Sequence, residues 1–336
     1  MAAKTLQPID SMKFPRFSQP ATFFRTPLCL EGTGPGGAPL DIAVIGVPFD
    51  FQTNRPGARH GPAQIREMSR LIRRHSASGG PSPFDLCNIA DAGDAPVIPL
   101  DIKRSIDEIA AFCAELDARG SMLLAAGGDH GATYPIWKGI HRGEKWGVIH
   151  FDSHPDTYHS FWGDRHNHGT LLRAGIEEGM IDPKRVISIG IRGTRFALDD
   201  RAFNKKTGMR VVTMDDFERM GRDRVIREIR RVVGRGPTYV TFDVDGLDPA
   251  YCIGTGAPEP GGIMMRDALV MLRSLKGLNI VGADVCEVSP PLDPSGHTAL
   301  NAANLMFELL CVMAEARVRR EPPARRPTRR SRRRAK

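Results

Sequence analysis

The chain has 336 residues, 41% of them hydrophobic and 26% charged, so it can bury a substantial core and is too apolar to be mostly disordered. It has no run of about 18 apolar residues, and its first residues lack the apolar segment of a secretory signal, which argues against a membrane span and against export. The formal charge of +8 is concentrated in residues 317–336, which carry eleven basic residues and one acid, so the rest of the chain is close to neutral.

Three regions are expected from composition. Residues 1–38 are rich in Pro, Gly and Phe and are interpreted as an N-terminal extension, in which a GxGxxG match at Gly32–Gly37 precedes the first apolar run and reads as a flexible loop. Residues 39–316 are expected to form one domain. Residues 317–336 are predicted to be a basic Arg/Pro-rich, disordered tail, with an adhesive segment for phosphate polymers or acidic surfaces as the alternative.

Apolar runs and helical periodicities alternate along the domain. In chain order, we expect a strand at Asp41–Pro48, helices at Ala63–Arg73 and Asp107–Ala118, a strand at Met122–Ala126, a helix at Tyr134–Ile140, a strand at Gly147–Phe151, a helical segment over residues 168–179, strands at Val186–Ile191 and Met209–Val212, a helix at Asp223–Val233, a strand at Thr238–Phe242, a helix at Arg266–Leu275, a strand at Ile280–Val285 and a helix from Thr298 to about Ala316. This alternation predicts an α/β fold with a mostly parallel central sheet and helices on both faces.

Three of these strands run directly into potential metal ligands. The side chains are His130 after the second strand, Asp152, His154 and Asp156 after the third, and Asp243 and Asp245 after the sixth. Sites in parallel α/β sheets form at the carboxyl ends of strands, where all three clusters fall. One such cluster is commonly a turn or a cap, but three at equivalent ends indicate a metal site.

The spacing of these ligands has a chemical meaning. Alternate residues of an extended segment point the same way, so Asp152, His154 and Asp156 can converge on one point. Carboxylates and imidazoles without thiolates favour Mn²⁺, with Zn²⁺, Fe²⁺ or Ni²⁺ as contenders. Six ligands are too many for one ion with an open position, so we expect two ions about 3.5–4 Å apart with a bridging water of lowered pKa. Such a site suits hydrolysis of a cationic substrate.

Other residues are less specific on their own. His168 is either a structural histidine or an acid/base group, and Glu287 either forms a surface salt bridge or accepts N–H bonds from a guanidinium. The six cysteines fall in no metal-binding or paired spacing and are interpreted as buried thiols in a reducing compartment, the cytoplasm.

Together these motifs resemble the ureohydrolase family, which includes arginases, agmatinases and guanidino-acid amidinohydrolases. The resemblance covers roughly Met12–Ala314 and depends on Gly127–His130, Asp152–Asp156 and Thr241–Pro249, in the family's order and spacing. It implies a three-layer αβα sandwich of the arginase/deacetylase type, assembled as a homo-oligomer of three or six subunits. The stretch from His168 to Gly193 is more similar to agmatinases than to arginases.

The resemblance also implies residue roles. His130, Asp152, Asp156 and Asp243 would bind one manganese, and Asp152, His154, Asp243 and Asp245 the other, giving two Mn²⁺ per subunit, with Ni²⁺ or another divalent ion possible. The bridging hydroxide would attack the guanidinium carbon, and Asp245 or Asp156 would help to reprotonate the intermediate. His168 would assist proton transfer or substrate binding, and Glu287 would hold the guanidinium.

The expected reaction is hydrolysis of agmatine to putrescine and urea. The alternative is a guanidino acid, as in a 4-guanidinobutyrase or 3-guanidinopropionase, or guanidine itself. The loop over residues 158–167 is aromatic and basic, so Trp162, Arg165 and His166 either line the pocket mouth, where they would attract a carboxylate, or belong to a surface loop. A deacetylase or a non-enzymatic binding module is disfavoured because no ligand position is lost. The expected partner is a small guanidino compound, with no membrane and no nucleic acid except through the tail.

Overall fold

A computed structural model describes residues 5–51, 53 and 55–320. Its centre is an eight-stranded sheet in the order β4-β3-β5-β10-β9-β6-β7-β8, in which every neighbouring pair is parallel. The strands of this sheet are β3 Ile42–Gly46, β4 Ile89–Asp94, β5 Met122–Ala126, β6 Trp146–Phe151, β7 Ile181–Ile191, β8 Arg210–Thr213, β9 Thr238–Asp243 and β10 Ile280–Cys286.

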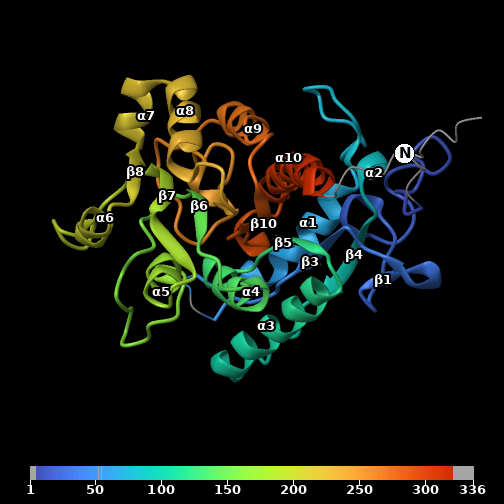
Figure 1. The fold of residues 1–336 in the computed structure, drawn as a ribbon, viewed down its shortest axis with the longest axis horizontal. Coiled ribbons are helices and arrows are strands. Elements are labelled where there is room, and N and C mark those ends of the chain that lie inside the picture. The colour runs from blue at the N-terminus through green and yellow to red at the C-terminus, as the bar shows by residue number, and fades with distance from the viewer. Residues whose placement is uncertain (1–4, 52, 54, 321–336) are drawn as a thin grey trace, which may run out of the picture.

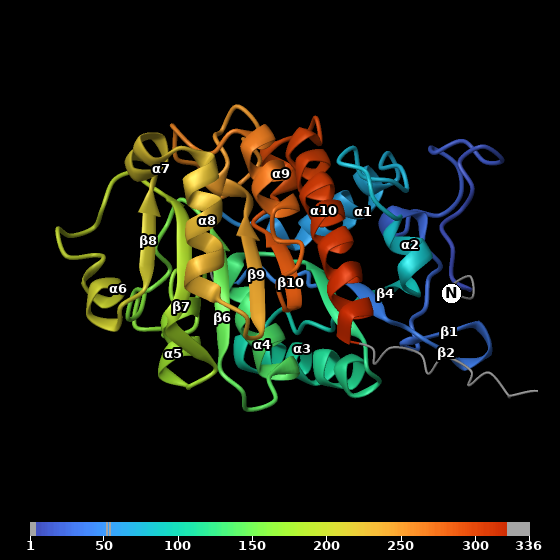
Figure 2. The ribbon, with the colours of Figure 1, turned by 45° about the horizontal axis from the view of Figure 1, so that its top comes forward.

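Helices cover both faces of the sheet, as the alternation of elements predicts. Figures 1 and 2 show α8, α9 and α10 on one face and α3, α4 and α5 on the other. The helices are α1 Gly61–Ser69, α2 Pro83–Leu86, α3 Ile102–Ala118, α4 Thr133–Ile140, α5 Leu171–Glu177, α6 Ala202–Thr207, α7 Met214–Met220, α8 Arg222–Val233, α9 Met265–Arg273 and α10 His297–Arg320. The three-layer αβα sandwich and the single domain are confirmed.

Each face of the sheet has its own apolar core. Along β3, Ile42 and Val44 pack in the cluster that contains α8–α10, whereas Ala43 and Ile45 pack in the cluster that contains α3 and α4. Because successive side chains of a strand point to opposite faces, a strand buried on both sides reads as a continuous apolar run. This is why the predicted strands contain so few polar residues.

Some helices and strands were not predicted from the sequence, or were predicted with other bounds. The edge strand β4 was not predicted because its apolar run contains Asp91, which is fully buried and accepts hydrogen bonds from Arg66 Nε at 2.7 Å and Phe23 N at 2.9 Å. Helix α3 begins at Ile102, five residues earlier than expected, since the Asp101 carboxylate caps it through Arg104 N at 2.9 Å. The short helices α2, α6 and α7 were also missed.

The C-terminal helix α10 extends beyond the expected Ala316 to Arg320. It is long and apolar enough to cross a membrane by length and composition, but 83% of its apolar window is buried inside the fold, as for a core helix. It packs against α1 and α9, and Phe307 meets Phe24 of the N-terminal region with ring centroids 5.9 Å apart. Residues 317–320, which were predicted to belong to the disordered tail, are therefore helical, and the remaining residues of that tail, 321–336, lie outside the described residues.

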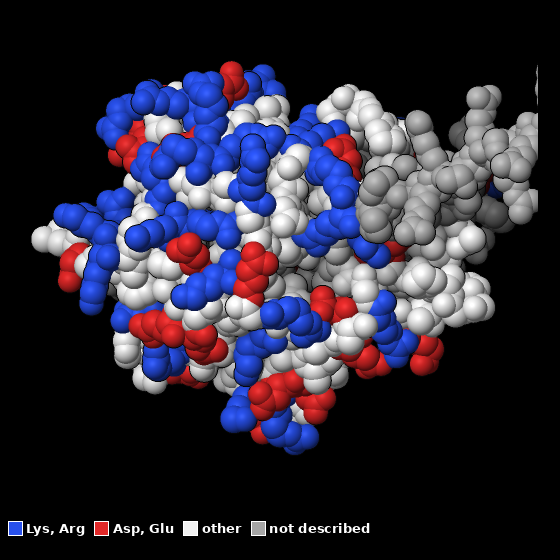
Figure 3. All heavy atoms as spheres, viewed as in Figure 1, with Lys and Arg blue, Asp and Glu red and all other residues white. Residues whose placement is uncertain are grey.

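A small hairpin, β1 Thr33–Gly34 with β2 Ala38–Pro39, spans the GxGxxG match. It lies away from the carboxyl ends of the sheet strands, near the N-terminal region (Figure 2). Basic side chains are unevenly spread over the surface, and Lys and Arg gather over α7 and α8 (Figure 3). The sequence of α8 accounts for part of this patch, since five of its twelve residues are arginine.

Candidate metal centre

The three predicted ligand clusters meet at one edge of the sheet. Strands β5, β10, β9 and β6 are neighbours in that order and parallel, so the segments that follow them lie side by side. The side chains brought together there are His130 after β5, Glu287 after β10, Asp243 and Asp245 at the end of β9, and Asp152, His154 and Asp156 after β6.

One group of ligands surrounds His130. Its Nδ1 lies 3.0 Å from Asp152 Oδ2, 2.9 Å from Asp156 Oδ2 and 3.4 Å from Asp243 Oδ2. All four side chains are at most 4% exposed. Three carboxylates and one imidazole therefore converge on a small buried volume.

A second group surrounds His154. Its Nδ1 lies 3.0 Å from Asp245 Oδ2 and 3.5 Å from Asp152 Oδ1. Asp152 therefore contributes one oxygen to each group. Asp243 lies between them, because its Oδ2 approaches His130 while its Oδ1 accepts a hydrogen bond from Asp245 N at 2.8 Å. Two ligand groups joined by a shared carboxylate are an arrangement suited to a pair of metal ions.

The chemistry of these donors fits divalent cations. His130 Nδ1 is buried and makes no hydrogen bond within the described residues, although three carboxylate oxygens surround it. Burial raises the pKa of Asp243 well above its usual value, and the neighbouring Asp245 and Asp152 raise it further by like-charge repulsion. A divalent cation held among these oxygens would offset that repulsion. Oxygen and nitrogen donors without a thiolate match the preference of Mn²⁺ and similar ions.

A shell of hydrogen bonds orients the ligands, and the sequence analysis did not identify it. His130 Nε2 pairs with Thr241 Oγ1 at 2.8 Å, and that hydroxyl donates to Asp284 Oδ1 at 2.6 Å. On the other side, His150 Nε2 lies 2.9 Å from Asp152 Oδ2, and its Nδ1 lies 3.0 Å from Ser188 Oγ. Such outer contacts fix the tautomer and orientation of ligands. His150 precedes Asp152 by two residues, and that spacing was the available signal.

The convergence within Asp152–Asp156 has a different cause from the one expected. The segment does not continue as a strand beyond Phe151, and Asp156 has a φ of 49°, in the left-handed region that non-glycine residues rarely adopt. Ser153 donates from its backbone N at 3.0 Å and from Oγ at 2.9 Å to Asp245 Oδ1, which links the turn to the segment that follows β9. A strained turn, and not an extended chain, directs these side chains together.

Glu287 lies against the His130 group. It follows β10 with a φ of 65°, is 4% exposed, and its Oε1 accepts a hydrogen bond from His130 N at 2.9 Å. Burial raises the pKa of its carboxyl well above the usual value, and Asp243 adds to the shift. A cation bound beside Glu287 would lower that pKa and ionise the group. The structure thus brings Glu287 to the predicted centre.

His168 approaches the centre from the loop before α5. Its Nε2 is buried with no hydrogen-bond partner among the described residues, and its ring lies 5.8 Å from that of Phe161. Burial lowers its pKa, although Asp156 partly opposes this. A neutral imidazole with an open nitrogen can exchange a proton with a reacting group.

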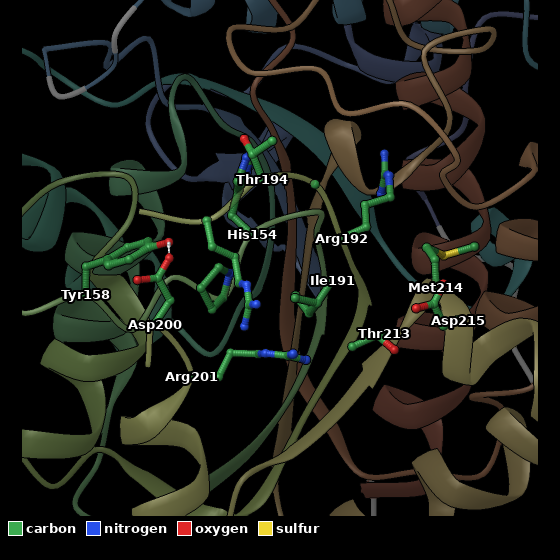
Figure 4. Close-up of a pocket in the computed structure, with 13 residues that line it drawn as sticks. His154, Tyr158, Ile191, Arg192, Thr194, Asp200, Arg201, Thr213, Met214 and Asp215 are labelled. Carbon is green, nitrogen blue, oxygen red and sulfur yellow. Dashed lines mark hydrogen bonds between the residues drawn. The ribbon is translucent and has the colours of Figure 1, made fainter. Parts of the chain in front are cut away.

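A cavity of about 300 Å³ opens beside the second ligand group. His154 lines it, with side chains from the loop after β7 and from the end of β8 (Figure 4). The charged residues of the lining are Arg192, Arg195, Asp200, Arg201 and Asp215. Sequence analysis singled out none of these residues, which are far from the ligand motifs along the chain.

The residues expected at the pocket mouth lie elsewhere. Arg165 pairs with Glu177, and His166 stacks on Tyr134 with ring centroids 4.7 Å apart. Both line a neighbouring cavity that contains no predicted ligand, and Trp162 is 81% exposed. The alternative of a surface loop therefore describes Arg165 and His166 better than a substrate rim.

Comparison with known proteins matches the chain to a family model, to curated relatives and to a solved structure. The model of the Arginase family matches residues 40–312. The chain is 47% identical over 315 residues to a guanidinopropionase of Pseudomonas aeruginosa, covering 93% of this chain and 98% of the relative. It is 44% identical over 278 residues to a mitochondrial agmatinase of Gallus gallus, covering 82% and 81%. A solved structure of proclavaminate amidinohydrolase from Streptomyces clavuligerus matches with a TM-score of 0.85 and 40% identity, covering 90% of this chain and 99% of that one.

Proposed function

The chain belongs to the arginase family of hydrolases, and we propose that it releases urea from a guanidino acid by means of a binuclear metal centre. The observation that carries this proposal is the pair of His/Asp groups that share Asp152 at the carboxyl ends of β5, β9 and β6, all of whose members are buried except the partly exposed His154. The reaction adds water across the bond between the guanidinium carbon and the substituted nitrogen, leaving urea and an amino acid.

The ligand assignment follows the two groups. His130, Asp152, Asp156 and Asp243 would hold one ion, and Asp152, His154, Asp243 and Asp245 the other. When bound, the ions supply a water of lowered pKa and balance the carboxylate charge. Manganese is proposed as the native metal, with nickel as the alternative, because the donors are oxygen and imidazole nitrogen.

Two further residues would act on the substrate. Glu287 is buried beside the His130 group, where a carboxylate can accept two N–H bonds from a guanidinium. His168 has a neutral ring with an unpartnered Nε2, so it can pass a proton to the departing amine. Asp156 and Asp245 are proposed to assist the same proton transfer from positions on opposite ligand groups.

The choice of substrate is supported by the cavity and by the relatives. Arg195 and Arg201 line the cavity that adjoins His154, so its outer part favours an anionic group over a second cation. The matched guanidinopropionase acts, by its name, on a guanidino acid. The second candidate is agmatine, the expectation from the sequence, and the similarity to the agmatinase of Gallus gallus favours it.

Urea release tests the proposal directly. Mn²⁺-loaded and Ni²⁺-loaded protein would be assayed with 3-guanidinopropionate, 4-guanidinobutyrate, agmatine, arginine and guanidine. We expect the highest kcat/KM for a guanidino acid, and loss of both metals and of activity in Asp152→Ala. Higher kcat/KM for agmatine would favour the second candidate. No urea from any substrate by protein that carries two metals per chain would reject the function.

The cellular compartment and the oligomeric state of the protein are also proposed. We propose a cytoplasmic protein, which is supported by six cysteines that are all buried and form no disulfide within the described residues. A trimer or hexamer is proposed from the family, and sedimentation of the purified protein tests it.

A further inference from the structure

We propose that Arg201 binds the carboxylate of the substrate, with Arg195 as a second donor. The inference rests on the proposed function and names the residue that would distinguish a guanidino acid from agmatine. Both arginines belong to the segment between β7 and α6, far in sequence from every ligand motif.

The position of Arg201 in the cavity supports this assignment. Arg201 immediately precedes α6 and lines the same cavity of about 300 Å³ as the predicted metal ligand His154. In Figure 4 its side chain extends across the cavity toward Ile191 and Thr213, at the carboxyl ends of β7 and β8. A small substrate with its guanidinium at the metal ligands would direct its other end into this space. The volume lies at the lower end of the range for small-molecule sites.

Arg201 also has unused hydrogen-bonding capacity. Within the described residues its guanidinium forms no hydrogen bond and no ion pair. Among the residues that the structure describes, Arg195 donates only to the Leu198 carbonyl, at 3.3 Å. Arg192 differs, because its guanidinium donates to backbone carbonyls that include Asp245 O at 2.7 Å and Leu247 O at 3.0 Å. Arg192 is therefore a structural brace, whereas Arg201 offers a free planar donor set.

The charge of the cavity lining also favours a bound anion. Two acids also line the cavity, but Asp200 already accepts hydrogen bonds from the Tyr158 hydroxyl at 3.1 Å and from two backbone amides at 2.8 Å. Asp215 is exposed and pairs with neither Arg195 nor Arg201. Three guanidinium groups against two carboxylates leave one positive charge in the lining.

This charge pattern matches one class of substrate. The carboxylates of the metal centre attract the guanidinium, while Arg201 can bind a carboxylate through two parallel N–H bonds. Agmatine carries an ammonium at the corresponding end and would meet an uncompensated arginine. Arg165, the basic residue first considered for this role, is neutralised by Glu177 outside this cavity and provides a matched control.

Direct binding separates this inference from catalysis. Calorimetry on metal-loaded protein would compare the product 4-aminobutyrate with n-butylamine, because neither is hydrolysed and the amine carries a methyl group in place of the carboxylate. We expect the wild type to bind the acid about 10- to 100-fold more tightly, and Arg201→Ala to lose most of that preference. Arg201→Lys should retain part of it, because the charge remains without the planar fork. Arg165→Ala should keep the wild-type preference.

Kinetics gives the second readout. Arg201→Ala should raise KM for the guanidino acid about 10- to 100-fold, with little change in kcat and none in metal content. Arg201→Glu should shift the ratio of kcat/KM values toward agmatine. Arg195→Ala should have the same effect as Arg201→Ala but smaller.

The outcomes keep the two proposals apart. If no urea is released but the wild type prefers the acid in calorimetry and Arg201→Ala does not, the proposed reaction fails and the carboxylate site stands. If guanidino acids are hydrolysed but Arg201→Ala keeps its KM and its binding preference, the Arg201 assignment is rejected. A KM increase in Arg165→Ala with none in Arg201→Ala would also reject it and move the site to the other cavity.

Discussion

His150 shows that single residues outside the ligand motif organise the metal centre. It is fully buried, its Nε2 contacts Asp152 Oδ2 at 2.9 Å, and Asp152 is the carboxylate that both ligand groups share. Burial opposes protonation of the ring, but Asp152 outweighs it and raises the pKa of His150 to about 9. The imidazole is therefore a donor that fixes one oxygen of Asp152.

Replacing His150 should weaken metal binding. In His150→Phe, Asp152 loses its orienting donor, and we expect Mn²⁺ affinity to fall about 10- to 100-fold with the fold intact. His150→Gln, which can still donate, should recover part of the affinity, and Ser188→Ala should have a smaller effect than His150→Phe. The measurement is Mn²⁺ titration with circular dichroism as the fold control. Unchanged affinity in His150→Phe would show that Asp152 needs no orientation.

Glu287→Gln tests the guanidinium contact. The amide oxygen can still accept the hydrogen bond from His130 N, so metal content should stay at the wild-type level. Loss of the negative charge should raise KM at least about tenfold, as expected for a hydrogen bond to a charged group. Steady-state kinetics and metal analysis on the same sample measure both quantities. Metal loss parallel to the loss of activity would make Glu287 a structural residue.

At the scale of elements, a charged cluster ties helix α8 to the edge strand β8. Glu228 of α8 accepts hydrogen bonds from Arg231 at 2.6 and 2.7 Å and from Arg210 of β8 at 3.0 Å. Arg231 first, and then Arg210, lower the pKa of Glu228 to about 2. The end of β8 lines the cavity, so this brace helps to hold one wall of it.

The brace predicts a pH-dependent contribution to stability. Because the pKa of Glu228 is lower in the folded state, the ionised group stabilises the fold at pH values above its unfolded-state pKa of about 4.3. This stabilisation is lost as the pH falls toward 2. Glu228→Gln should therefore lower the free energy of unfolding by about 1 kcal/mol at pH 7 and by progressively less below pH 4. Urea titrations at several pH values measure this. Glu218→Gln on α7, an exposed acid without an ion pair among the described residues, is the control, and an equal effect of both changes would contradict the prediction.

At the scale of the whole molecule, α10 contacts elements that are far apart in the sequence. Its apolar residues complete the core on the α8–α10 face, and its last turn reaches other elements. Arg317 lies 3.4 Å from Asp41 next to β3, and Arg320 donates to Asn279 and to the carbonyl of Ile280 at the start of β10. The last four residues of the helix thus belong to the folded domain.

Two truncations test this boundary. Removing residues 321–336 should leave kcat/KM and thermal stability nearly unchanged, because the described domain retains every contact around the site. Removing residues 317–336 should destabilise the protein by about 1–2 kcal/mol through loss of the Arg317 and Arg320 contacts. Thermal unfolding and urea release of both forms measure the two effects. A large loss of turnover on removal of residues 321–336 alone would assign the tail a role in catalysis.

The sequence by itself determined the layer architecture and the positions of the six candidate ligands. Both are local signals: an apolar run predicts a buried strand, and the acids and histidines that follow it lie at that strand's carboxyl end. Elements with weak local signals were missed, such as β4, whose buried Asp91 needs Arg66 as a distant partner. The spacing of Asp152, His154 and Asp156 also did not predict their turn, since that turn depends on the contact of Ser153 with Asp245 beyond the end of β9.

Only the tertiary structure decided which residues share a space. The order β5-β10-β9-β6 places Glu287 beside His130 and gives both ligand groups a common Asp152, although β5 and β10 are far apart in the chain. It also leaves Arg201 in the cavity next to His154 and pairs Arg165 with Glu177 outside it. The sequence alone does not distinguish an arginine with a free guanidinium from one that forms an ion pair. Whether a guanidinium is free or neutralised depends on long-range packing, and that packing is set by the strand order of the sheet.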